Sequence, residues 1–178
     1  MLDVARVQES DTAPSQVLAL PALVQRIAAD WVRQHPVGGR LLVDLPAHPC
    51  QAWFDAEHLR RILVNLLDNA LRYASEQPAA IVLRLRPLDE AWQELSVWSD
   101  GQPLEESLQK HLFEPFFSSE SRSSGLGLYI CRQLCERHEA KILYRLGIHQ
   151  GRRGNEFVLY LRADFGDGAT QGFESTLI

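Results

Sequence analysis

The 178-residue chain lacks the features of several common protein classes. Its three cysteines, Cys50, Cys131 and Cys135, are too few and odd in number for a disulfide framework. Cys131 and Cys135 lie one helical turn apart, but no pair of histidines accompanies them, so we expect buried thiols in a reducing compartment rather than a zinc site. No apolar run approaches the roughly 18 residues of a membrane-spanning helix. Charged residues near the start of the chain also interrupt the apolar segment of a secretion signal.

An excess of positive charge is missing as well. The chain has 18 basic and 23 acidic side chains and a net charge of −5, which argues against a general nucleic-acid binder. The motifs of P-loop enzymes, of serine hydrolases and of zinc proteases are also absent. What is there is ordinary for a globular protein, because 46% of the residues are hydrophobic and 23% are charged. The chain is long enough for one domain with its own core.

The spacing of apolar residues predicts helices interleaved with strands. Helical spacing runs from Pro21 to just before Pro36, from an N-cap at Asp55 to about residue 74, and over about 126–138. Strands are expected at 41–45, 51–54, 81–86, 94–98, 141–146 and 156–161. This order favours an α+β fold, a two-layer α/β sandwich with the helices on one face of a mixed sheet. We expect this domain at residues 16–163, after a helical end and linker at 1–15 and before a loosely ordered tail at 164–178.

The helix that begins after Asp55 carries an unusual polar face. Its residues Asn65, Asp68, Asn69 and Arg72 lie along one side, although asparagine is a poor residue for the middle of a helix. Side-chain oxygens at this spacing could hold Mg²⁺, and the guanidinium could meet phosphate charge. The alternative is a solvated face with one ion pair between Asp68 and Arg72, and on this helix alone that alternative is favoured.

A segment with two glycines opens the third predicted helix. In Ser123-Ser-Gly-Leu-Gly-Leu128 the glycines let the backbone approach a ligand closely, and the helix start offers free N–H groups to an anion. The segment lacks the third glycine of a dinucleotide-binding fingerprint. Before it lies Phe113-Glu-Pro-Phe-Phe117, whose phenylalanines could anchor a lid or be ordinary core aromatics beside a turn.

Taken together and in order, these segments resemble the ATP-binding domain of histidine kinases. The run 63–73 resembles its N box, Phe113–Phe117 its F box and Gly125–Leu128 its second glycine box. The resemblance covers residues 16–163. The run 112–135 is most similar to the nitrogen-regulation class of sensor kinases, and within that class to those of type IV pilus regulation. The resemblance implies the Bergerat fold of histidine-kinase and gyrase ATPases, with ATP bound between helices and a lid.

The resemblance also assigns roles on the helix after Asp55. Asn69 is the implied Mg²⁺ ligand, and Asn65 is implied to contact phosphate or a metal-bound water. Arg72 takes the basic position that faces the phosphates, and Tyr73 takes the aromatic position beside the nucleotide. The ATP-hydrolysing relatives have a glutamate at the position of Asn65. Because an amide cannot act as that base, the resemblance implies phosphotransfer rather than hydrolysis.

The segment before the third helix supplies the other half of the implied site. Arg122 is implied to reach the γ-phosphate and to complete the catalytic set with Asn65 and Arg72. Further nucleotide contacts are implied for Phe113, Phe117, Ser124, Gly125, Leu126, Gly127 and Leu128. Glu120 departs from the family pattern, because close relatives tend to carry lysine there and a carboxylate adds negative charge near the phosphates.

The adenine end of the implied site departs further from the family. The first glycine box should read Asp-x-Gly-x-Gly after the strand that ends at Trp98, but the chain reads Ser99-Asp-Gly-Gln-Pro103. With Gly101 aligned to the first glycine, Ser99 takes the place of the adenine-binding aspartate and Pro103 that of the second glycine. Three explanations stay open: a shifted strand end that turns Asp100 inward, adenine contacts through Ser99 and water, or weakened nucleotide binding.

Sensor kinases phosphorylate a histidine on a preceding helical hairpin, and the chain has no such histidine box. The resemblance therefore implies a monomeric catalytic domain with two partners, the phosphoacceptor histidine domain of the same parent protein and a downstream response regulator. It implies a cytoplasmic domain of a parent anchored in the bacterial inner membrane, without membrane or nucleic-acid contacts of its own. Two alternatives remain: a degenerate Bergerat module with a docking or regulatory role, and a gyrase-type hydrolase, which Asn65 disfavours.

Overall fold

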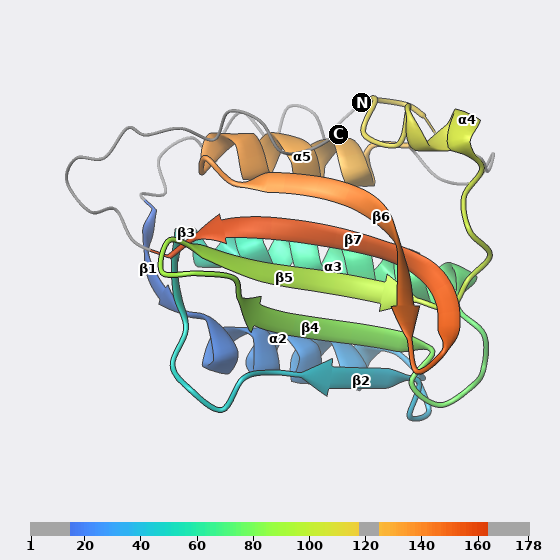
Figure 1. The fold of residues 1–178 in the computed structure, drawn as a ribbon, viewed down its shortest axis with the longest axis horizontal. Coiled ribbons are helices and arrows are strands. Elements are labelled where there is room, and N and C mark those ends of the chain that lie inside the picture. The colour runs from blue at the N-terminus through green and yellow to red at the C-terminus, as the bar shows by residue number, and fades with distance from the viewer. Residues whose placement is uncertain (1–14, 118–124, 164–178) are drawn as a thin grey trace.

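The computed structural model describes residues 15–117 and 125–163, and these residues are built around a five-stranded sheet (Figure 1). The strand order is β2-β4-β5-β7-β6. The sheet is mixed, because β2 runs parallel to β4 whereas the other neighbouring pairs are antiparallel. The strands are β2 Leu41–Asp44, β4 Ile81–Pro87, β5 Trp92–Ser99, β6 Lys141–His149 and β7 Arg152–Arg162.

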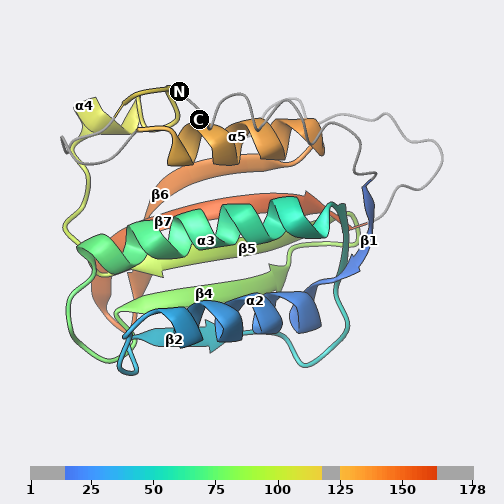
Figure 2. The ribbon, with the colours of Figure 1, turned by 180° about the vertical axis from the view of Figure 1, so that it is seen from behind.

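Within the described residues, three long helices cover one face of this sheet (Figure 2). They are α2 Leu20–Gln34, α3 Ala56–Tyr73 and α5 Gly127–Arg137. Each helix turns an apolar stripe toward the sheet, and the buried stripes include Leu23, Ile27 and Trp31 of α2, Leu59, Leu63 and Leu66 of α3, and Ile130 and Leu134 of α5. The predicted sandwich, with helices on one face of a mixed sheet, is therefore confirmed.

The limits and the orientation of α3 follow from its sequence. Asp55 is its N-cap, as predicted, and the carboxylate accepts a hydrogen bond of 2.8 Å from the backbone N–H of His58. The helix ends at Tyr73, next to the predicted end at residue 74. Its leucine-rich side is buried, and this burial fixes the rotation of the helix about its axis. The direction of the polar face is thereby fixed as well.

Two short elements depart from the sequence prediction. β1 Gln16–Ala19 pairs antiparallel with β3 Gln51–Phe54 in a separate two-stranded sheet. α4 Glu106–Gln109 is one helical turn within a stretch expected to be irregular and polar. Apolar periodicity cannot reveal such elements, because β1 buries only Leu18 and α4 buries no residue.

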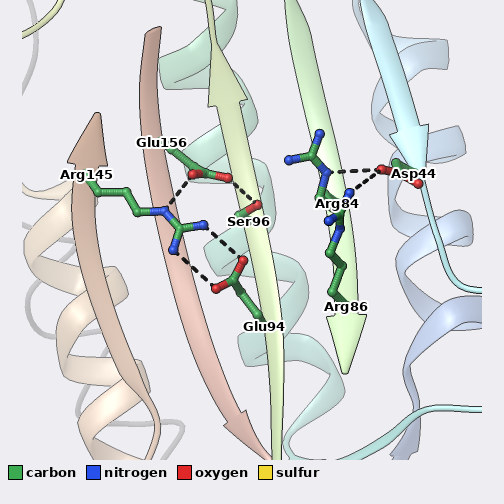
Figure 3. Close-up of polar contacts among 7 residues, drawn as sticks. All are labelled: Asp44, Arg84, Arg86, Glu94, Ser96, Arg145 and Glu156. Carbon is green, nitrogen blue, oxygen red and sulfur yellow. Dashed lines mark hydrogen bonds and ion pairs between the residues drawn. The ribbon is translucent and has the colours of Figure 1, made fainter. Parts of the chain in front are cut away.

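The face of the sheet opposite the helices carries ion pairs between strands (Figure 3). Arg145 of β6 donates to Glu156 of β7 at 2.7 Å and to Glu94 of β5 at 3.0 Å. Arg84 of β4 donates to Asp44 of β2 at 3.1 Å. The Arg84–Asp44 and Arg145–Glu156 contacts link neighbouring strands, whereas the Arg145–Glu94 contact reaches across β7 from β6 to β5.

The segments expected to flank the domain lie mostly outside the described residues. Residues 1–14 and 164–178, which include most of the expected linker and the whole expected tail, lie outside the described residues. The division at 15/16 and 163/164 thus stays a prediction. Among the described helices, none has the length and apolar character needed to cross a membrane.

Candidate functional site

A cavity of about 710 Å³ lies between α3, the start of α5 and the segment that follows β5. Its volume is that of a pocket for a small molecule. Many of the site residues expected from the sequence line it: Asn65, Asn69, Arg72, Tyr73, Ser99, Phe117, Gly125, Gly127 and Leu128. Folding thus brings three separate parts of the sequence to one place.

The polar face of α3 forms one wall of this cavity. Asn65, Asp68, Asn69 and Arg72 all line it, which confirms that the helical spacing directs them to one side. The amide nitrogen of Asn65 donates to the backbone carbonyl of Arg61 at 3.1 Å. The amide oxygen of Asn65 is therefore the atom left to face a ligand.

Asp68 ties this wall to α2. Its carboxylate accepts a hydrogen bond of 2.7 Å from the indole N–H of Trp31, and Nε2 of His35 lies 3.3 Å from the same oxygen. Trp31 is buried, so the contact holds the two helices at a fixed separation. The simpler interpretation, a solvated face with one ion pair between Asp68 and Arg72, does not account for these contacts.

Two glycines permit close packing at the start of α5. Gly125 has a φ of +64°, and a Cβ there would lie 2.6 Å from the backbone of Phe116. A Cβ at Gly127 would lie 3.1 Å from the side-chain oxygen of Asn65. Gly127 begins α5 and lines the cavity, so the positive end of the helix dipole lies at the cavity wall.

The cavity wall has the chemistry to bind a magnesium-bound polyphosphate. Arg72 and the start of α5 supply positive potential. Amide oxygens such as those of Asn65 and Asn69 are ligands that Mg²⁺ accepts beside phosphate oxygens and water. Among the described residues, no cluster of three or more His, Cys, Asp or Glu could hold a metal ion. Mg²⁺ bound by one or two protein side chains usually takes its other ligands from water and substrate phosphates.

The end of β5 decides whether Ser99 or Asp100 of the altered glycine box faces the cavity, which Gln102 and Pro103 also line. Side chains alternate between the faces of a strand, and Ser99 follows Val97 onto the helix-covered face, where both line the cavity. The carboxylate of Asp100 instead accepts hydrogen bonds from the backbone N–H of Ser75 at 2.9 Å and from Arg152 at 2.9 Å. Of the three open explanations, the shifted strand end that turns Asp100 inward is therefore wrong, because strand alternation and these partners hold Asp100 outside the cavity.

Asn155 is a cavity residue that sequence reasoning alone did not find. It lies on β7 directly opposite Ser99 and is 7% exposed. Its side-chain nitrogen donates to the carbonyls of Gly101 at 3.2 Å and Gln102 at 2.9 Å, and its oxygen accepts from the N–H of Leu104 at 3.2 Å. A polar residue at an inward strand position is the signal that could have identified it, but the inward direction is known only from the register.

Some implied contact residues lie behind the cavity wall instead. The ring of Phe113 packs edge-on against Phe157, with centroids 6.3 Å apart, and is not among the described residues that line the cavity. Leu126 is the N-cap of α5 and packs on the core. Gly101 allows the loop to touch the end of α3, because a Cβ there would lie 2.9 Å from the carbonyl oxygen of Tyr73. The expected residues Glu120, Arg122 and Ser124 lie outside the described residues.

Residues 54–164 match the family described as "Histidine kinase-, DNA gyrase B-, and HSP90-like ATPase". The chain belongs to this family. The matched range contains α3, the end of β5, the start of α5 and Asn155, and so includes every wall of the cavity.

Two relatives of the chain are sensor kinases. The chain is 33% identical to "Sensor protein kinase PilS" of Pseudomonas aeruginosa over 146 residues, which are 80% of this chain and 28% of that protein. It is 28% identical to "Adaptive-response sensory kinase SasA" of Crocosphaera subtropica over 149 residues, 79% of this chain and 39% of the relative. The chain thus spans well under half the length of these relatives.

Solved structures of histidine kinases share the fold. The mycobacterial sensor histidine kinase MprB superposes with a TM-score of 0.68 at 23% identity, covering 83% of this chain and 97% of that one. The nucleotide-free catalytic domain of histidine kinase ThkA gives a TM-score of 0.69 at 22% identity, covering 85% and 99%. The fold is therefore that of histidine-kinase catalytic domains, as the sequence resemblance implies.

Proposed function

We propose that this chain is the ATP-binding catalytic domain of a two-component sensor histidine kinase, which transfers the γ-phosphate of ATP to a histidine on a separate domain. One observation carries the proposal. The asparagine-bearing face of α3 and the glycine-flanked start of α5 meet at one cavity in a member of an ATPase family. Neither segment alone would indicate a nucleotide, whereas together they supply a cation site and an anion site side by side.

Four residues of the cavity wall, together with Arg122 outside the described residues, have a proposed part in this transfer. Asn69 holds Mg²⁺, and the side-chain oxygen of Asn65 contacts a phosphate-bound cation or its water. Arg72 and the N–H groups at Gly127 balance phosphate charge, and Arg122 is proposed to reach the γ-phosphate. Bound Mg²⁺ supplies charge neutralisation on the phosphates. The amide of Asn65 cannot remove a proton from water, which favours transfer over hydrolysis.

The partners and the setting are proposed from the relatives. The phosphoacceptor is a histidine domain of the same parent protein, and the phosphate then passes to a response regulator. The similarity to PilS suggests type IV pilus regulation as the setting, and a cytoplasmic catalytic domain on a parent anchored in the inner membrane.

Binding of a non-hydrolysable ATP analogue with Mg²⁺, followed by calorimetry, tests the proposal. We expect saturable binding to the wild-type chain. Asn69→Ala should weaken it at least about tenfold, equivalent to ~1.4 kcal/mol, because one cation ligand is lost. Gln25→Ala, on the exposed side of α2, is the matched control and should bind as the wild type does.

Two results would count against the kinase function. Absence of binding at millimolar nucleotide by a chain with a native circular dichroism spectrum would instead support a degenerate docking module. Steady release of phosphate from ATP by the chain alone would support a hydrolase.

A further inference from the structure

Two polar side chains from neighbouring strands of the sheet face the same part of the cavity. Ser99 ends β5 and Asn155 lies on β7, and the two are direct partners in the antiparallel register. Both line the cavity, and they are 6% and 7% exposed. Polar groups this deeply placed need partners, either from the protein or from a ligand.

Asn155 already has its partners. Its nitrogen donates to the carbonyls of Gly101 and Gln102, and its oxygen accepts from the N–H of Leu104 and the hydroxyl of Tyr144. A flipped amide would set its N–H groups against the N–H of Leu104, so the amide has one orientation. Asn155 therefore fixes the loop after β5 and has no hydrogen-bonding group left for a ligand.

Ser99 is different, because its hydroxyl has no partner within residues 15–117 and 125–163. Its neighbour Asp100 cannot substitute for it, since that carboxylate is held outside the cavity by Ser75 and Arg152. A hydroxyl rotates freely and either donates or accepts a hydrogen bond. A carboxylate at the same position would only accept one.

We propose that Ser99 contacts position 6 of the purine through its hydroxyl, so that the cavity binds 6-oxo and 6-amino purine nucleotides with similar affinity. This inference rests on the proposed nucleotide-binding function and on the alignment of Ser99 with the adenine-binding aspartate of the family. A carboxylate would select the 6-amino group, which donates, and would oppose the 6-oxo group, which accepts. Serine meets either group by turning its O–H, and Asn155 is not available to restore the discrimination.

Calorimetric titration with ADP and with inosine diphosphate, each with Mg²⁺, tests this directly. For the wild-type chain we expect two dissociation constants within about tenfold of each other. Ser99→Asp should tighten ADP binding and weaken inosine diphosphate binding, so that their ratio exceeds about a hundredfold. Ser99→Ala should weaken both nucleotides by similar factors and leave the ratio near that of the wild type.

The outcomes separate the two proposals. A wild-type preference for ADP above about a hundredfold overturns the shared base recognition and leaves nucleotide binding intact. If Ser99→Ala loses ADP binding but keeps inosine diphosphate binding, the shared base recognition is overturned as well. This variant adds no buried charge that could prevent folding. If neither nucleotide binds to the folded wild-type chain, both the inference and the proposed function are wrong.

Discussion

Single side chains hold the loop after β5 in place, and Asn155 makes most of these contacts. The hydroxyl of Tyr144 assists, because it donates to Asn155 at 2.7 Å and accepts from the N–H of Leu104 at 3.3 Å. Burial raises the pKa of Tyr144, which keeps its hydroxyl protonated as a donor. The loop forms one wall of the cavity, so its position depends on a residue from a distant strand.

Asn155→Ala should lower the free energy of unfolding by about 2–3 kcal/mol, because it leaves buried carbonyls and an N–H without a partner. Tyr144→Phe is the matched comparison and should cost about 1 kcal/mol, since Asn155 keeps its other three hydrogen bonds. Urea unfolding measures both. Equal losses in the two variants would contradict a central role for Asn155.

At the scale of elements, a pair of buried histidines joins the start of α3 to the end of α5. His58 Nδ1 and His138 Nε2 are 2.8 Å apart and share a hydrogen bond. The other ring nitrogen of His138 lies 2.6 Å from the hydroxyl of Ser15, ahead of β1. Burial and then His58 lower the pKa of His138, whereas Asp55 opposes this shift. The folded protein therefore favours the neutral ring.

We expect stability to fall as the pH drops below about 6.5, the ordinary histidine pKa, because the unfolded chain then binds the proton that the folded chain resists. The contribution of the neutral His138 ring to stability is fully present above that pH. His138→Gln should lose less stability between pH 7.5 and pH 5.5 than the wild type does, as measured by urea unfolding at both values. Burial and Arg84 also lower the pKa of His149, which remains in both proteins, so the difference between them isolates His138. An identical loss in the variant would contradict this role.

The open face of the sheet depends on one guanidinium that spans three strands. Partial burial lowers the pKa of Arg145, but hydrogen bonds to Glu156 and Glu94 outweigh this effect and raise the pKa overall. Glu156 is 4% exposed and also accepts from the hydroxyl of Ser96 at 2.8 Å (Figure 3). Removing the arginine would leave a buried carboxylate without its cation.

Arg145→Met should therefore lower the free energy of unfolding by about 2 kcal/mol. Arg86→Met is the matched control, because Arg86 is 60% exposed and its nitrogen lies 3.6 Å from Asp44. A surface ion pair of that kind contributes between about 0 and 1 kcal/mol. Thermal and urea unfolding of the two variants should separate them, and equal effects would contradict the importance of the buried pair.

At the scale of the whole molecule, a ligand in the cavity should stabilise the entire fold, since its walls come from α3, β5, β7 and α5. Mg-ADP at a hundred times its dissociation constant should add ~2.7 kcal/mol. For a chain of this length that shift raises the melting temperature by about 5–10 °C. Gly127→Val should abolish the increase, because a side chain there fills the space beside Asn65. Mg²⁺ alone is the control, and an unchanged shift in the variant would place the ligand elsewhere.

Much of the architecture could be predicted from local patterns. The three long helices, the strands of the main sheet, the N-cap at Asp55 and the shared direction of Asn65 and Asn69 depend on residue spacing within one segment. β1 and α4 could not be predicted, because each is only four residues long and lacks a periodic pattern.

The sequence by itself determined the helices, the strands and the face on which each polar side chain of α3 lies, because these follow from spacing along the chain. Only the tertiary structure decided between Ser99 and Asp100, since the choice depends on which face of β5 packs against the helices. It alone placed Asn155 opposite Ser99 and joined Asp68 to Trp31. Both contacts join residues that are far apart in the sequence, so the spacing within one segment does not reveal them.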